Sequence, residues 1–403
     1  MRVAVTGANG LLGAHVVRAL LAAGHKPVAV VRERADLRGL TGIDAPLARA
    51  DTRSRDDLMR AFDGAGVVVH CAAVYSYSQD AAALERANVD GTRRVMEAAS
   101  EAGVRRVVLT SSSVTCGSSA GPQPRDETGA IEDEWVPAYF RTKVQQERVA
   151  AHVAQSRGLE LVVACPTVVL GGPDWRLVPS NTVLVRYLLD PTRTTFPGGC
   201  NIVAVGDVAR GHVLLAEHGK PGEQYLLGGE DLGWRTLHTL VSELTGISGP
   251  HLTGSRSSAW LAASLAEGVA RLTGKPSLAT RDEARTVGRW YWYSSAKAAE
   301  LGYTARPARA TIAGALAWLV TSPHVPRLVR ESLNLAQEVY GARELVPARH
   351  PSASSSPSSR SSSSRPSSSR RSASQRPSSQ RSSSSPSASK QTASGRRSSS
   401  PSS

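Results

Sequence analysis

Paired cysteines and long apolar segments are both missing from this sequence of 403 residues. The four cysteines lie far apart, and neither they nor the histidines show the spacing of a disulfide framework or a metal site. No uncharged apolar run reaches the roughly 20 residues that a membrane-spanning helix needs. The opening MRVAVTG has no charged leader segment. We therefore expect free thiols, no bound metal and a cytoplasmic protein.

Acidic residues are absent from the last segment of the chain. Residues 351–403 contain nine Lys and Arg and no Asp or Glu, so they carry +9 of the formal net charge of +14. From about residue 346 the composition is Ser, Arg and Pro, which cannot bury enough apolar surface to offset the entropy lost on ordering. We predict a disordered tail over 346–403. Because it has no interleaved aromatic residues, it offers little beyond charge for binding nucleic acid or an anionic surface.

Short valine-rich runs alternate with helix-patterned segments over the first 165 residues, as in RVAVTG, PVAVVR, GVVVHCAA and VVLTSSS. This rhythm predicts an α/β fold with a Rossmann-type, doubly wound parallel sheet. Beyond it the pattern loosens into segments rich in Gly and Pro. We therefore expect a cofactor-binding domain over 1–165, to which 200–228 returns, and a smaller, discontinuous substrate-binding part over 166–199 and 229–345.

A glycine-rich turn follows the first apolar run, in VAVTGANGLLGAHVV. Its glycines are spaced by three residues between a predicted strand and a predicted helix. Glycines there let the backbone approach a pyrophosphate, which the free N–H groups of the helix N-terminus stabilise. The sequence therefore predicts dinucleotide contacts from Gly7, Asn9, Gly10, Leu11, Leu12 and Gly13.

The second strand ends in AVVRER, so Arg32 stands where a carboxylate would bind a ribose 2′-hydroxyl. An arginine suits a 2′-phosphate, which favours NADPH over NADH. The alternative is a solvated arginine at the end of a strand. Asp51 and Thr52 close the third strand and are candidates for contact with the adenine end, although Asp51 also suits a helix cap.

Several motifs recur in a fixed order: TGANGLLG, HCAA, NVDGT, VVLTSSS, YFRTK and YSSAKAAELGYTARP. Together they resemble the extended short-chain dehydrogenase/reductase family, also called the NAD-dependent epimerase/dehydratase family. Within it the chain is similar to the branch of dihydroflavonol-4-reductase-like and hopanoid-associated sugar epimerase-like proteins. The resemblance covers residues 1 to about 325. It implies an NAD(P)-dependent oxidoreductase that acts on CH–OH or carbonyl groups.

Tyr139 and Lys143 lie one helical turn apart in PAYFRTKVQQERVA, so both side chains share one face. The resemblance implies that Tyr139 is a proton donor, that the Lys143 ammonium stabilises its phenolate and binds the nicotinamide ribose, and that Ser112 orients the carbonyl. Ser111 and Ser113 are neighbouring rivals, but they should point away from the site if Ser112 points into it.

The resemblance also implies that several other residues lie beside the cofactor. Ala72 and Ala73 are small, as a loop beside the cofactor requires, and Pro166, Thr167 and Val168 should lie against the nicotinamide. Asn88 is predicted either to brace the active site through backbone bonds or to be an ordinary buried asparagine. Related folds also pair through the helix that would carry Tyr139, so a homodimer is possible.

The residues after the sixth strand indicate the class of substrate. Nucleotide-sugar enzymes of the family usually have an Arg-x-x-Asn pattern there, whereas this chain has Cys165, Pro166, Thr167 and Val168. This departure favours a ketone or aldehyde on a more apolar skeleton. The aromatic run RWYWYSS would wall such a pocket, although core packing explains it equally well.

These observations predict an NADPH-dependent reductase or dehydrogenase that transfers hydride between the nicotinamide and a carbonyl or secondary alcohol of a small, fairly apolar substrate. Tyr139 is its general acid and base. Two alternatives stay open. One is an NAD(P)-dependent nucleotide-sugar epimerase or dehydratase, and the other is a non-catalytic dinucleotide-sensing regulator whose tail attracts nucleic acid.

Overall fold

The computed structural model describes residues 1–77, 80–133, 135–273, 277 and 279–344. The predicted tail over 346–403 lies outside the described residues. None of the described helices is both long and apolar enough to cross a membrane.

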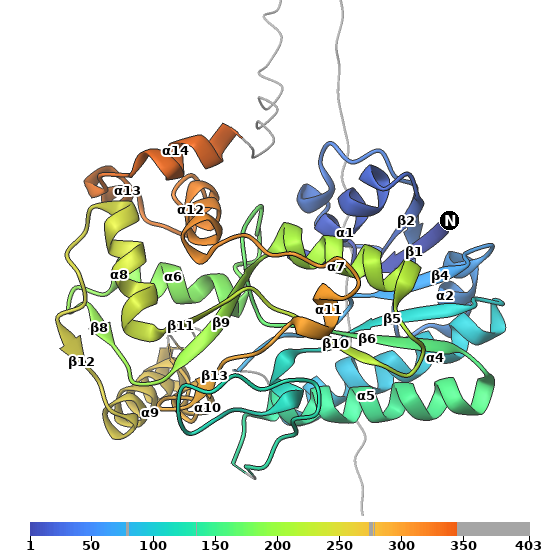
Figure 1. Ribbon diagram of the computed structural model, residues 1–403, viewed down its shortest axis with the longest axis horizontal. Coiled ribbons are helices and arrows are strands. Elements are labelled where there is room, and N and C mark those ends of the chain that lie inside the picture. Colours follow the sequence, from blue (N-terminus) through green and yellow to red (C-terminus); the bar gives the residue numbers. More distant parts are fainter. Residues whose placement is uncertain (78–79, 134, 274–276, 278, 345–403) are drawn as a thin grey trace, which may run out of the picture. The chain divides into compact units, whose positions relative to one another are not determined.

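A seven-stranded parallel sheet forms the centre of the described chain (Figure 1). Its strands, in spatial order, are β10 (Gln224–Leu227), β6 (Glu160–Pro166), β5 (Arg106–Thr110), β4 (Val67–His70), β1 (Arg2–Thr6), β2 (Lys26–Val31) and β3 (Leu47–Arg49). Strands β1, β4 and β5 are almost entirely buried, because a parallel sheet is covered on both faces. The predicted doubly wound α/β fold is confirmed.

Alternate residues of each strand enter two separate cores. Val3 and Val5 of β1 pack on one face and Ala4 on the other. One face is covered by α1 (Leu11–Ala22) and α7 (Val205–His218). The opposite face is covered by α2 (Arg55–Phe62), α4 (Gly91–Glu101) and α5 (Ala138–Arg157) (Figure 1). Shorter turns complete this part: η1 (Arg38–Leu40), α3 (Ala81–Glu85), η2 (Arg86–Asp90) and η3 (Ser113–Cys116).

Local sequence fixes where α5 begins and ends, and therefore where its side chains lie. Pro137 immediately precedes the helix, which suits an N-terminus because proline has no N–H to leave unpaired. Gly158 ends it in the left-handed conformation, with a φ of +68°. Tyr139 is thus in the first turn of α5, and Lys143 is in the second.

A second core lies beyond β6 and combines a small sheet with helices. The sheet has the order β11 (Glu230–Gly233), β9 (Gly199–Ala204) and β13 (Trp290–Tyr291), and β7 (Val168–Leu170) also pairs with β9. Strands β8 (Thr194–Thr195) and β12 (Leu252–Thr253) form a separate pair. The helices are α6 (Pro179–Leu189), α8 (Trp234–Thr245), α9 (Arg256–Thr273), α10 (Arg281–Ala284), α11 (Ala296–Ala299), α12 (Ala308–Leu319), α13 (Arg327–Ser332) and α14 (Gln337–Glu344).

The segment expected to return to the main sheet divides between the two parts. Helix α7 covers that sheet and β10 is its edge strand, whereas β9 pairs within the small sheet. The division into a cofactor-binding domain and a substrate-binding part stays a prediction.

Candidate active site

A cavity of about 810 Å³ runs along the carboxyl ends of β1, β4, β5 and β6 and continues into the second part. In doubly wound sheets this edge is where ligands bind. Its wall includes most of the predicted site residues: Gly7, Asn9, Gly10, Leu11, Leu12, Gly13, Ala73, Ser112, Tyr139, Lys143, Pro166, Thr167 and Val168. Five predicted residues are not in the wall that the described residues form: Arg32, Asp51, Thr52, Ala72 and Asn88.

The glycine turn brings three backbone segments together at one end of this cavity. Gly7 has a φ of +66°, and a Cβ on it would lie 2.8 Å from the backbone of Ala72. A Cβ on Gly13 would lie 2.3 Å from the carbonyl oxygen of Gly7. Gly10 precedes α1 with no side-chain cap, and the first turn has no acidic residue, so its N–H groups suit a pyrophosphate. These residues fit a dinucleotide.

Tyr139 is 93% buried, since only 7% of its surface is exposed. Burial raises the pKa of its phenol well above the ordinary value, the Tyr75 phenol raises it further, and a hydrogen bond with Ser112 lowers it. The centroid of the Tyr75 ring lies 4.7 Å from that of Tyr139. Tyr139 is therefore a neutral phenol that lies between a serine hydroxyl and an aromatic ring.

The ammonium of Lys143 lies 5.9 Å from the centroid of the Tyr139 ring. It donates hydrogen bonds to the carbonyl oxygen of Thr110 at 3.0 Å and to Oε1 of Gln146 at 2.8 Å. Burial lowers the pKa of Lys143 to about 8, although the Glu147 carboxylate acts to raise it. An ammonium has three donors, and these two acceptors among the described residues leave one donor for a ligand in the cavity.

The three consecutive serines after β5 have different partners. Ser111 donates a hydrogen bond to the carboxylate of Glu147, and Ser112 is the residue within hydrogen-bonding reach of Tyr139. Burial raises the pKa of Tyr293, and a hydrogen bond with Ser113 partly offsets this effect. The geometry therefore pairs Ser112, and neither of its neighbours, with the Tyr139 phenol.

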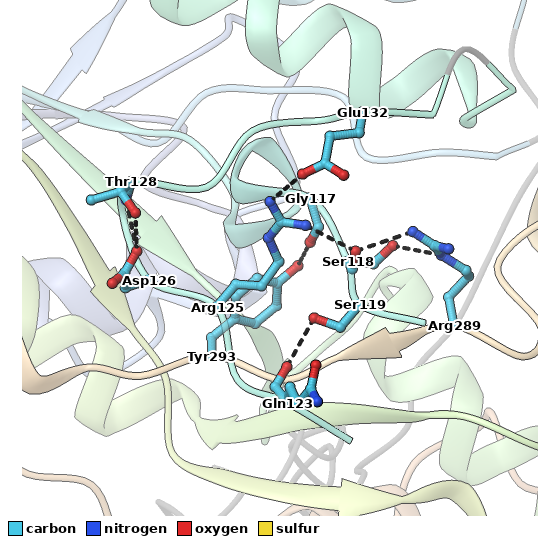
Figure 2. A network of polar contacts seen from close by, with 10 residues as sticks. All are labelled: Gly117, Ser118, Ser119, Gln123, Arg125, Asp126, Thr128, Glu132, Arg289 and Tyr293. Carbon is cyan, nitrogen blue, oxygen red and sulfur yellow. Dashed lines mark hydrogen bonds and ion pairs between the residues drawn. The ribbon is translucent and has the colours of Figure 1, made fainter. Parts of the chain in front are cut away.

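The loop beyond these serines is anchored to β13 and the residues on either side of it. Figure 2 shows the guanidinium groups of Arg125 and Arg289 both pointing toward Ser118. Arg125 donates to the Ser118 carbonyl oxygen at 3.1 Å, and Arg289 donates to the Ser118 hydroxyl at 3.0 Å. The Tyr293 hydroxyl donates to the carbonyl oxygen of Gly117 at 2.7 Å. These contacts fix the chain just beyond Ser112.

A family model for the NAD dependent epimerase/dehydratase family matches residues 3–228. This span includes the glycine turn, Ser112, Tyr139 and Lys143. The chain belongs to this family. The predicted resemblance is confirmed, and with it an NAD(P)-dependent oxidoreductase of the extended short-chain type.

Individual family members match most of the chain. Sterol demethylase protein B of Methylococcus capsulatus is 32% identical over 337 residues, which is 79% of this chain and 98% of that protein. A putative dihydroflavonol 4-reductase of Synechocystis is 30% identical, covering 80% of this chain and 95% of that protein. The crystal structure of gox2253 superposes with a TM-score of 0.70 at 32% identity, over 80% of this chain and 99% of that one.

Three residues predicted to contact the adenosine part of the dinucleotide lie outside the cavity wall that the described residues form. Arg32 is exposed at the end of β2. Asp51 accepts hydrogen bonds from the backbone and side chain of Arg53, and it does not cap α2, since Ser54 does. Thr52 lies beside Gly91. A Cβ built on Gly91 would be 3.4 Å from the Thr52 hydroxyl oxygen.

Ala72 and Asn88 support the cavity from behind its wall. The Ala72 N–H donates to the Thr6 hydroxyl at 3.3 Å. Asn88 is fully buried, and its amide exchanges hydrogen bonds with the backbone of Val74 at 2.7 and 3.0 Å. Asn88 thus holds the segment after β4 through backbone hydrogen bonds. It is at the same time a buried asparagine whose amide is hydrogen-bonded, so the two alternatives do not exclude each other.

The aromatic run of residues 290–293 contributes both to the cavity wall and to packing. Tyr291 and Tyr293 line the cavity. Trp290 and Trp292 pack edge to face with centroids 4.7 Å apart, and the Trp292 indole donates to the carbonyl oxygen of Leu232. Tyr291 and Tyr293 also pack against the hydrophobic cores, so the tyrosines take part in both the wall and the packing.

Several residues of this site are absent from the sequence-based prediction. The ring of Tyr75 covers that of Tyr139. Gln146 and Glu147 both interact with Lys143. Asp36 lines the cavity together with the glycine turn. Glu147 could have been found, because it lies four residues after Lys143 on the same helix. Tyr75 had a weaker signal, its position in the segment after HCAA. Among the described residues, no group of three or more His, Cys, Asp or Glu is arranged to hold a metal ion.

Proposed function

We propose that the protein is an NADPH-dependent reductase that transfers hydride to a carbonyl group of a small, fairly apolar substrate, with Tyr139 as the proton donor. One observation carries this proposal. The cavity that begins at the glycine turn also contains a buried tyrosine with a serine hydroxyl and a lysine ammonium beside it.

Each of the three side chains has a distinct task in the reduction. When bound, the reduced nicotinamide supplies the hydride, and the carbonyl oxygen gains negative charge. The Ser112 hydroxyl donates a hydrogen bond to this oxygen, and Tyr139 transfers its proton to it. The Lys143 ammonium stabilises the phenolate that remains and binds the nicotinamide ribose through its free donor. The residues Gly7, Gly10 and Gly13 hold the pyrophosphate.

The cavity beyond Tyr139 is walled by large apolar and aromatic side chains, including Trp175, Val183, Phe196 and Trp234. These side chains favour an apolar skeleton over a sugar diphosphate. Cys165 and the residues after it offer no amide side chain at the position where nucleotide-sugar enzymes usually have asparagine. The names of the sterol and dihydroflavonol relatives agree with this class of substrate.

The preference for NADPH is supported by charge. Arg32 at the end of β2 offers a cation to a 2′-phosphate. Asp36 lies four residues after Arg32 and lines the cavity, and hydrogen bonds from Arg38 lower the pKa of Asp36 to about 2. Because the Arg38 guanidinium pairs with the Asp36 carboxylate, this carboxylate would repel a 2′-phosphate only weakly.

A substrate panel with NADPH tests the proposal, using flavonoid-like ketones, steroids, aldehydes and nucleotide sugars. We expect net loss of the reduced-nicotinamide absorbance with an apolar ketone or aldehyde, and a loss of about 10²–10⁴ in kcat for Tyr139→Phe. Tyr303→Phe is the matched control. Tyr303 is buried, lies outside the cavity wall and donates a hydrogen bond to the carbonyl oxygen of Gly228. Turnover of a nucleotide sugar without net oxidation would support the epimerase instead.

A further inference from the structure

Lys143 is one end of a continuous line of buried hydrogen bonds that leads to the end of β1. Gln146 accepts from the ammonium at 2.8 Å, and its amide N–H donates to the Thr92 hydroxyl at 2.7 Å. Thr92 is 2.9 Å from Nε2 of His70, whose Nδ1 is 2.7 Å from the Thr6 hydroxyl. All five side chains are at most 2% exposed. The line therefore joins four elements, α5, α4, β4 and β1, inside the protein.

The chemistry of the ammonium fixes the direction of the Gln146 amide. Lysine can only donate, so the oxygen of the amide must face Lys143 and the nitrogen must face Thr92. A flipped amide would place two sets of donors against each other and leave the buried ammonium without one of its two acceptors. Thr92 in turn is held by His70. Burial lowers the pKa of His70 to about 3, so it is neutral and accepts or donates one bond at each nitrogen.

We propose that Gln146 is a positioning residue for Lys143, and that Thr92 and His70 set its orientation. Together with the Thr110 carbonyl, Gln146 occupies two of the three donors of the ammonium and aims the third at the ribose of the dinucleotide. The Gln146 oxygen also stabilises the charged form of this buried lysine. This inference rests on the proposed role of Lys143 in cofactor binding.

Burial lowers the pKa of Lys143, and the neighbouring titratable groups that can be ionised oppose this effect. Glu147, one turn further along α5, favours the ammonium, as would the thiolates of Cys165 on β6 and Cys71 after β4. Burial raises the pKa of both thiols, so they are neutral where Lys143 titrates. The neutral His70 adds no charge. Gln146 is therefore the neutral side chain that contacts the ammonium directly, and its replacement changes hydrogen bonding without removing a charge.

The test measures dinucleotide affinity against pH by the fluorescence of NADPH and NADH, using whichever binds more tightly, and needs no substrate. In Gln146→Met, which has a similar shape and no acceptor, we expect the dissociation constant to rise about tenfold at pH 7. We also expect the pH at which binding weakens to fall by about one unit, because a hydrogen bond to a charged group is lost. Gln146→Glu should shift that pH upward.

The neighbouring Gln145→Met is the matched control, because Gln145 is exposed on the same helix. Thr92→Val removes the support of the amide at nearly constant volume and should shift the pH in the same direction as Gln146→Met, by a smaller amount. A Gln146→Met protein that loses thermal stability but keeps the pH dependence of the Gln145→Met protein would overturn the inference, since Gln146 would then only join α4 to α5.

Failure of the proposed function gives a different result. If Lys143→Met bound the dinucleotide as tightly as the unaltered protein, the proposed role of Lys143 would be wrong. If Lys143→Met weakened binding while Gln146→Met and Thr92→Val did not, only the positioning role of Gln146 would be wrong.

Discussion

The ring of Tyr75 covers the ring of Tyr139, with the two centroids 4.7 Å apart and the planes inclined by 32°. This contact keeps the Tyr139 phenol out of water and restricts where it can point. We predict that Tyr75→Ala lowers kcat about ten- to a hundredfold, because small displacements of a reacting group carry costs of that order. Tyr75→Phe keeps the ring and should stay within about threefold of the unaltered protein. Steady-state kinetics on the substrate found in the panel measures both.

The pair of variants separates packing from hydrogen bonding at Tyr75. Burial raises the pKa of Tyr75 to about 12, so its hydroxyl is neutral at every pH used for the assay. Equal losses in Tyr75→Phe and Tyr75→Ala would show that the hydroxyl matters and the ring contact does not.

The lowered pKa of Lys143 predicts an alkaline limit to cofactor binding. A lysine keeps its ammonium below its pKa and loses it above, and burial brings this pKa down to about 8 from an ordinary value of about 10.4. We therefore expect dinucleotide affinity and kcat/KM to be level below pH 8 and to fall above it, where an unperturbed lysine would still be charged. Titration from pH 6.5 to 10 measures this.

Lys143→Met supplies the control for the alkaline limit. Methionine is uncharged at all pH values, so this variant should bind weakly and show no decline near pH 8. A decline that persists in Lys143→Met would assign the limit to another group.

The main sheet and the centre of the site could be predicted because their signals are local. The runs at β1, β4 and β5 are apolar on both faces, and this pattern is typical of covered parallel strands. The glycine turn adjoins β1 directly. Tyr139 and Lys143 need only the period of one helix to share a face.

The rest of the site comes from contacts between distant segments. Strand β13 has two residues, and it exists because it pairs with β9, some ninety positions earlier. Tyr75 reaches Tyr139 from the segment after β4, and Gln146 matters because Thr92 on α4 faces it. No periodicity in the sequence carries such pairings, since they depend on how completed elements pack.

Arg32 provides a test of cofactor choice. We predict that Arg32→Glu weakens NADPH binding about tenfold or more and leaves NADH binding nearly unchanged, because a carboxylate repels the 2′-phosphate and can accept from a 2′-hydroxyl. The ratio of the two dissociation constants is the measurement. Arg60→Glu, on the exposed surface of α2, makes the same change of charge away from the cavity wall. Similar ratios in both variants would mean that net charge alone is responsible.

Substitution of Gly13 tests whether helix propensity or close backbone packing dominates at this position. Alanine at this position of α1 would gain up to about 1 kcal/mol from propensity alone, but its Cβ would lie 2.3 Å from the Gly7 carbonyl oxygen. The Gly7 backbone cannot move away without opening the glycine turn, and overpacking of this kind costs about 1–3 kcal/mol. We predict that Gly13→Ala lowers the free energy of unfolding and dinucleotide affinity together. Gly314→Ala in α12, where a Cβ meets nothing within 4 Å, should gain stability with unchanged affinity. If both variants gained stability and kept their affinity, the glycine turn would not require its close backbone contact.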